Sequence, residues 1–155
     1  MPRAMVVLIA VMGALALGLS GPAAAQSSSR VTPEQVVRVA QRSYNGVVET
    51  YSRKILRLRA NAVRTIERAR QTGQPQPRIF RYATIQQQRI DKAFQIGNTT
   101  LSVKQRNILE AAARVPVDQA TFSQLQAVGS TASNQLSNTW SQSRNAVSVA
   151  ASPPQ

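Results

Sequence analysis

The chain lacks cysteine and histidine altogether among its 155 residues. Without them it forms no disulfide, no catalytic site that depends on either residue, and almost none of the usual zinc, copper or haem sites. Aromatic residues are also scarce, at 5%. A core made mainly of Ala, Val, Ile and Leu is thin, and it favours a helix bundle over a β-sandwich.

Acidic side chains are few as well, and their spacing separates them. Three stand far apart on one predicted helix, and three are single residues near predicted helix ends. A glycosidase pair or a carboxylate metal site needs two or more to meet. We therefore expect a non-enzymatic protein with no catalytic residue, no metal site and no cofactor. The six are Glu34, Glu49, Glu67, Asp91, Glu110 and Asp118.

The first 25 residues have the order of a secretory signal. Arg3 precedes an apolar run over residues 6–19, and Ala23, Ala24 and Ala25 follow as a small-residue cleavage site. The run is too short to span a membrane, which takes about 20 residues. We expect cleavage near Ala25 and a secreted or periplasmic protein.

Positive charge is abundant and unevenly placed. The formal net charge is +13, with 19 Lys and Arg against 6 Asp and Glu. After Arg114 the only charged side chains are Asp118 and Arg144. The chain therefore has a basic part, followed by a neutral part rich in Ser, Gln, Asn and Ala.

A long helix is predicted over residues 33–71. Thr32 and Gln35 form a capping box around Pro33, which suits the first helical position. Apolar residues then recur with a mean step of about 3.6, the period of an α-helix. Gly73 and Pro75 mark its end.

The two faces of this predicted helix separate cleanly. At 100° per residue, one side is a row of Arg and the opposite side is apolar. Glu49 and Glu67 fall within the Arg row and neutralise part of it. The predicted anion-binding residues are Arg38, Arg42, Arg53, Arg57, Arg64 and Arg68. The predicted packing face comprises Tyr44, Tyr51, Ile55, Leu58 and Ile66.

Further helices are predicted over residues 78–96, 102–114 and 118–149. Gly97 ends the first of these, Ser102 starts the next with a capping box, and Asp118 caps the last. Ile85 and Ile96 fall off the apolar face of their helix. The last helix has a weak apolar stripe of small residues, and a flexible tail is expected over residues 151–155.

These elements predict one all-α domain over residues 26–150. The lengths favour an elongated up-down-up helical bundle whose middle leg is broken near Asn98. The rival is a long helical hairpin, or coiled coil, that completes its core by self-association into a homo-oligomer.

The leading functional hypothesis is an exported basic protein that binds an anionic envelope partner through the Arg row. Lipid head groups, an acidic polymer and an acidic protein all fit this chemistry, whereas export argues against nucleic acid as a native partner. The alternative is a structural or assembly module that uses the apolar stripe, with the Arg row merely solvated. A third interpretation is peripheral membrane contact, with the apolar face of the first helix in lipid.

Overall fold

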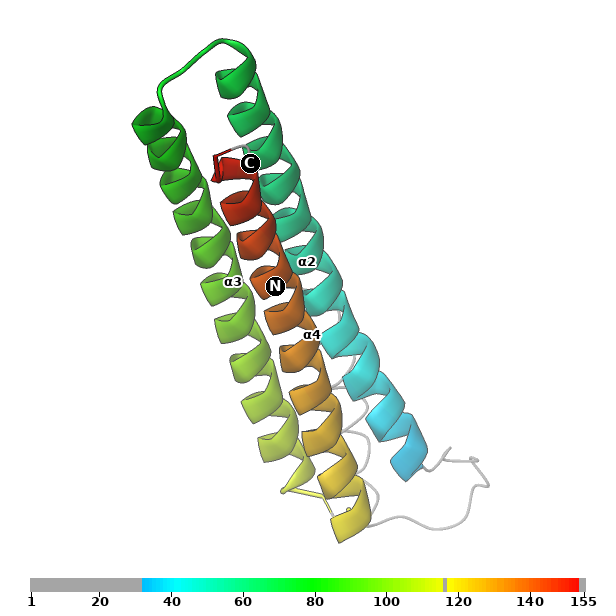
Figure 1. Ribbon diagram of the computed structural model, residues 1–155. Helices are drawn as coiled ribbons and strands as arrows, with labels where there is room; N and C mark the ends of the chain where they lie inside the picture. The colour runs from blue at the N-terminus through cyan, green and yellow to red at the C-terminus, as the bar shows by residue number, and fades with distance from the viewer. Residues whose placement is uncertain (1–31, 116, 154–155) are drawn as a thin grey trace, which may run out of the picture.

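Three long helices form an antiparallel bundle, so the all-α prediction is confirmed (Figure 1). The computed structural model describes residues 32–115 and 117–153. The helices are α2 (Pro33–Gln71), α3 (Gln76–Ala112) and α4 (Gln119–Ala151). The predicted signal segment, residues 1–25, lies outside the described residues.

The ends of α2 follow the local chemistry of its sequence. Thr32 Oγ1 accepts a hydrogen bond from the Gln35 backbone N–H at 3.3 Å, and Gln35 Oε1 accepts one from the Thr32 N–H at 2.9 Å. Both halves of the predicted capping box are therefore present. At the other end Gly73 adopts a φ of +66°, which glycine reaches without steric cost, and the chain turns there into α3.

The predicted break in the middle leg is wrong, because α3 is one continuous helix of 37 residues. Gly97 is buried within it, where an added Cβ would lie 2.8 Å from Tyr51 Cγ and 2.9 Å from Leu136 Cδ2. Ser102 does not cap a new helix, since its Oγ donates back to the Asn98 carbonyl at 3.0 Å. The glycine thus serves close packing of three helices rather than termination.

The last helix begins as predicted and runs further than expected. Asp118 Oδ1 accepts a hydrogen bond from the Thr121 N–H at 2.6 Å, and hydrogen bonding from the Thr121 side chain and then from its backbone lowers the pKa of Asp118. The helix continues to Ala151, which is buried, so the predicted tail starts too early. Gln76 Nε2 donates to the Ala151 carbonyl at 2.7 Å, and Arg70 donates to the Ser152 carbonyl.

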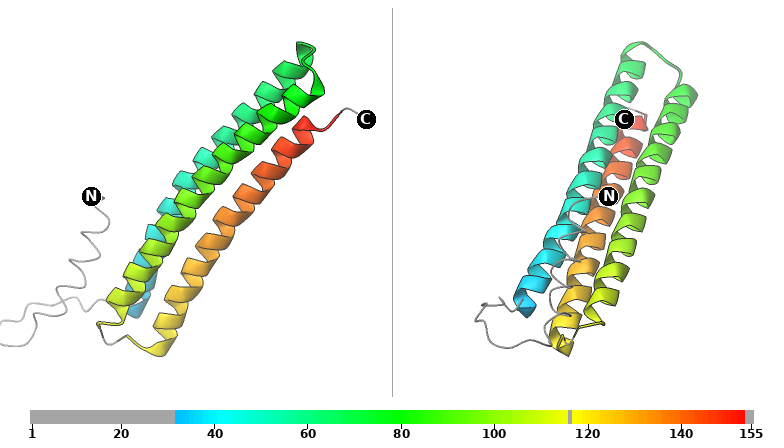
Figure 2. Two further views of the ribbon diagram at one scale, coloured as in Figure 1. Left: turned by 90° about the vertical axis from the view of Figure 1, so that its left-hand side faces the viewer. Right: turned by 180° about the vertical axis from the view of Figure 1, so that it is seen from behind.

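All three helices share one core along the length of the bundle (Figure 2). Tyr44, Ile55 and Ile66 of α2 are fully buried, while Tyr51 and Leu58 are half-buried and pack against them. The apolar stripe of α2 is therefore covered by α3 and α4 of the same chain. This arrangement buries the predicted packing face of α2 within the chain itself, while Leu56 of α2 stays exposed.

One polar atom in this core is not satisfied. The Tyr44 hydroxyl is buried and has no hydrogen-bond partner among the described residues. Burial favours the neutral phenol and raises the pKa of Tyr44 to about 12.

Candidate anion-binding face

The six predicted Arg side chains are all exposed, but they do not form one row in the folded bundle. Ser43 accepts a hydrogen bond from Lys104 Nζ at 2.9 Å, so Ser43 marks the side of α2 that adjoins α3. At 100° per residue, Arg57, Arg64 and Arg68 lie within about 60° of Ser43. These three arginines therefore face the α3 side.

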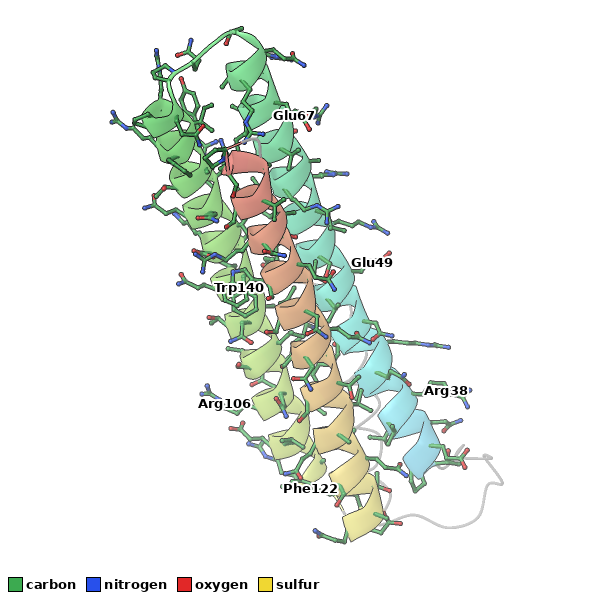
Figure 3. The ribbon with its side chains drawn as sticks, in the orientation of Figure 1. Arg38, Glu49, Glu67, Arg106, Phe122 and Trp140 are labelled. Carbon is green, nitrogen blue, oxygen red and sulfur yellow. The ribbon has the colours of Figure 1, made fainter. Side chains whose placement is uncertain are left out.

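The other predicted arginines belong to the outer side of α2. Figure 3 shows Arg38, Glu49 and Glu67 projecting from α2 away from α3. Arg42 shares this side by helical periodicity. Arg53 lies at its border and forms an exposed ion pair with Glu49. The acidic residues thus offset mainly the outer arginines, although Glu67 is also three residues from Arg64.

A matching basic row on α3 was not predicted from the sequence. Arg78, Arg89 and Lys92 are exposed and share one side of α3 with Val103. At 100° per residue this side lies about 140–180° from Gln87, whose side chain donates to Ser148 of α4, so it is the side of α3 that faces away from α4. The sequence signals this row through spacings of three, four, seven and eleven residues along 78–103. The assumed helix break at Gly97 hid the pattern, because it divided the row between two predicted helices.

The register brings the two rows to the same levels. Because Tyr51 lies beside Gly97 and Ser43 beside Lys104, the antiparallel pairing places Arg57 level with residues 90–91. Arg57 therefore sits between Arg89 and Lys92 along the bundle. Arg68 reaches the level of residues 79–80, close to Arg78.

We call this surface the basic face. It consists of two rows of cations on the side of the bundle opposite α4. The right-hand view of Figure 2 looks onto this side, with α2 and α3 in front of α4. Its members are Lys54, Arg57, Arg64 and Arg68 of α2, and Arg78, Arg89 and Lys92 of α3. A shallow hollow on α2, lined by Asn61, Arg64, Thr65 and Arg68, lies within it.

Carboxylates of the described residues lie outside this stretch. Glu49 and Glu67 project from the outer side of α2, Asp91 faces α4, and Asp118 caps α4. Glu110 shares a side with Lys92 but stands about 27 Å further along α3. The basic face thus consists of cations, with Glu67, three residues from Arg64, at its edge.

The α3–α4 side carries a different cluster, which sequence spacing could not reveal. Trp140 Nε1 donates to Asp91 Oδ1 at 2.7 Å, and the Trp140 ring stacks on Phe94 with centroids 4.7 Å apart. Arg144 lies 3.5 Å from the same carboxylate oxygen and above the indole ring. Asp91 was expected near a helix end, whereas it lies in the middle of α3 and ties it to α4.

The described residues provide no metal centre and no membrane-crossing helix. No group of three or more Asp or Glu side chains comes together among them. Likewise, none of their helices has an apolar stretch long enough to cross a bilayer.

Comparisons with known proteins place this chain in no family. No family model matches the sequence, and neither the curated proteins nor the solved structures give a significant match.

Proposed function

We propose that this chain is an exported, non-enzymatic helical protein that binds an anionic partner through the basic face. The proposal rests on seven exposed cations, which form two adjacent rows with no carboxylate between the rows. Summed positive potential of this kind attracts anions and raises their local concentration.

The composition of the face supports phosphate or carboxylate groups as its target. Five of the seven cations are arginines, whose planar guanidinium groups bind such anions in a bidentate manner. These side chains are solvent-exposed, so their attraction is screened within about 10 Å at 0.1 M salt. Binding is therefore expected to weaken steeply as salt is added.

Two triple variants of equal charge test the proposal. Changing Arg57, Arg64 and Arg89 to Gln removes three charges from the basic face. Changing Arg38, Arg42 and Arg53 to Gln removes three charges from the outer side of α2. Binding to immobilised heparin or polyphosphate, measured at several salt concentrations, should fall much further in the first variant than in the second.

Equal losses in the two variants would show that net charge alone matters, and would reject the basic face as a site. No binding by the unmodified protein at low salt would reject the proposed function as a whole.

Export is supported by the order of charged, apolar and small residues over 1–25. Mass spectrometry of the protein recovered from its native cell should give a mature chain that begins near Gln26. An intact N-terminus would contradict this part of the proposal.

The alternative of an assembly module has less support. It depends on an apolar stripe that is open to a partner, whereas Ile55 and Ile66 are fully buried under α3 and α4. The part of this alternative that remains is a bundle whose basic face is exposed to solvent and binds no partner. The two triple charge variants test that case.

A further inference from the structure

Three apolar side chains are exposed on the side of α3 that carries the α3 row of the basic face. Ile85, Ile96 and Val103 keep 40%, 42% and 44% of their surface accessible. Together with the cations they form one line in the order Arg78, Ile85, Arg89, Lys92, Ile96, Val103, at steps of seven, four, three, four and seven residues, so that Ile85 lies between cations and Ile96 and Val103 continue the line beyond Lys92. These steps keep all six on one side of the helix.

This row takes no part in the core. The packing side of α3 is formed by other residues, among them Ile79, Ile90 and Ile108, which are almost completely buried. Single exposed apolar residues are common on protein surfaces. Here, however, three β-branched residues lie along one line with the α3 cations of the basic face.

We propose that the basic face docks on an anionic phospholipid surface, with Ile85, Ile96 and Val103 entering between the head groups. This inference rests on the proposed function and names the partner of the same site. The seven cations contact lipid phosphates, while the apolar side chains reach the boundary of the acyl region. Proteins that lie on membranes combine these two contributions, apolar burial and attraction to anionic lipid.

The spacing favours a lipid surface over an acidic amphipathic helix. Ile85 and Ile96 are about 16 Å apart along α3, and Ile96 and Val103 about 10 Å. A docking helix presents anchors at steps of three and four residues and needs a continuous apolar seam. The facing row of α2 offers only polar positions, since Lys54, Arg57 and Asn61 occupy it. Widely spaced apolar side chains in line with cations suit a layer of lipid head groups instead.

This contact differs from the one that the sequence suggested. The interpretation from the sequence placed the apolar face of α2 in lipid. Tyr44 and Ile66 of that face are instead buried inside the bundle. The surface proposed here leaves the bundle folded, and it uses residues that fall outside the packing face of α3.

The test uses the mature full-length chain and vesicles of phosphatidylcholine, with or without phosphatidylglycerol. The variant replaces Ile85 and Ile96 with Ser. A matched control replaces Leu56 and Val149 with Ser, because these side chains are also exposed, at 41% and 66%, but lie outside the basic face. Vesicle co-sedimentation gives the affinity for lipid, and immobilised polyphosphate gives the affinity for a soluble anion. Circular dichroism checks that each variant is folded.

We expect binding to the vesicles that contain phosphatidylglycerol and none to pure phosphatidylcholine. The Ile85→Ser, Ile96→Ser variant should bind the anionic vesicles about tenfold more weakly, because partial burial of two isoleucines is lost. Its binding to polyphosphate should not change, and the control variant should behave as the unmodified protein in both assays.

Three results would overturn the lipid proposal. Unchanged vesicle affinity in the isoleucine variant would show that the apolar residues do not enter the bilayer. Binding to polyphosphate but not to anionic vesicles would point to an acidic polymer and leave the proposed function intact. Tight binding of an acidic helical peptide, with none to vesicles, would identify a protein partner. Failure to bind either anion would reject the proposed function itself.

Discussion

The two sides of this bundle are both built from α-helices, but they differ in surface charge. The α2–α3 side is charged, with cations on both helices and acidic residues kept to its edges. The α4 side is nearly neutral, since Arg144 is the one charged residue within Gln119–Ala151. Its exposed positions are mainly Ser, Asn, Gln and Thr. One side is thus suited to an anionic partner, and the other contributes mainly packing.

The positively charged α2–α3 side depends for its stability on the packing that α4 contributes. Like charges on adjacent helices repel, so the basic face requires attraction elsewhere to keep α2 and α3 together. Helix α4 contributes Leu125, Leu136 and Val147 to the shared core, all fully buried. The cluster of Trp140, Phe94 and Asp91 adds a further tie between α3 and α4. Four predictions separate the two roles.

The largest effect is expected from Leu136→Ala. Leu136 is fully buried and lies beside Gly97, where residues of all three helices meet. Removing it leaves a cavity and should lower the free energy of unfolding by about 3 kcal/mol. Urea unfolding followed by circular dichroism measures this loss.

The same variant should bind polyphosphate normally wherever it remains folded, because it removes no charge. Gln135→Ala, at an exposed neighbouring position, serves as the control and should change neither property. A folded Leu136→Ala variant with weakened anion binding would show that the two sides are not separable.

The next effect concerns the interior that joins the two sides. Burial raises the pKa of Tyr44 from 10.0 to about 12, so the unfolded chain loses this proton first as pH rises. Tyr44 therefore leaves stability unchanged below pH 10 and lowers it between pH 10 and pH 12. The expected loss is about 2–3 kcal/mol, since each pKa unit corresponds to about 1.4 kcal/mol.

Tyr44→Phe should remove that alkaline loss and cost little at neutral pH, because the buried hydroxyl has no hydrogen-bond partner. Urea unfolding of both proteins across this pH range provides the comparison. An equal alkaline loss in the variant would assign the effect to other groups.

How far the sequence predicts this structure depends on the range of the interaction involved. The capping box at Thr32 and the N-cap at Asp118 rest on contacts three residues apart, and both were predictable. The buried stripes of α2 and α4 follow helical periodicity and were predictable too. The contact of Trp140 with Asp91 joins residues 49 apart, and no local pattern signals it.

The candidate site shows the same division. Periodicity identified the arginines of α2 but not which of them adjoin α3, because that depends on which neighbour covers each flank. The prediction that Gly97 ends a helix was wrong for a related reason. A glycine that ends a helix and one that lets two helices approach are identical in sequence, and only the positions of Tyr51 and Leu136 distinguish them.

The third prediction compares two helical glycines, one at the junction of the three helices and one on the surface. A Cβ at Gly97 would meet the Tyr51 ring and Leu136, whereas a Cβ at Gly46 meets nothing within 4 Å. Gly46→Ala should stabilise the protein by about 0.5–1 kcal/mol through helix propensity. Gly97→Ala should destabilise it by about 1 kcal/mol, because overpacking outweighs the same gain. Thermal melts of the two variants should shift in opposite directions, and a stabilised Gly97→Ala would refute the tight three-helix junction.

The smallest effect on stability is expected where the effect on binding is large. Changing Arg57, Arg64 and Arg68 to Gln alters three exposed positions of α2. Arg64 loses its hydrogen bond to Asn61 Oδ1, which is exposed and contributes little. The repulsion between Arg64 and Arg68, four residues apart, is removed at the same time and offsets part of that loss. Because surface changes of this kind usually stay within about 0.5 kcal/mol each, the melting curve and the helical signal should remain nearly unchanged. Unfolding of this variant would mean that the arginines support the bundle themselves, and the division between a binding side and a packing side would then fail.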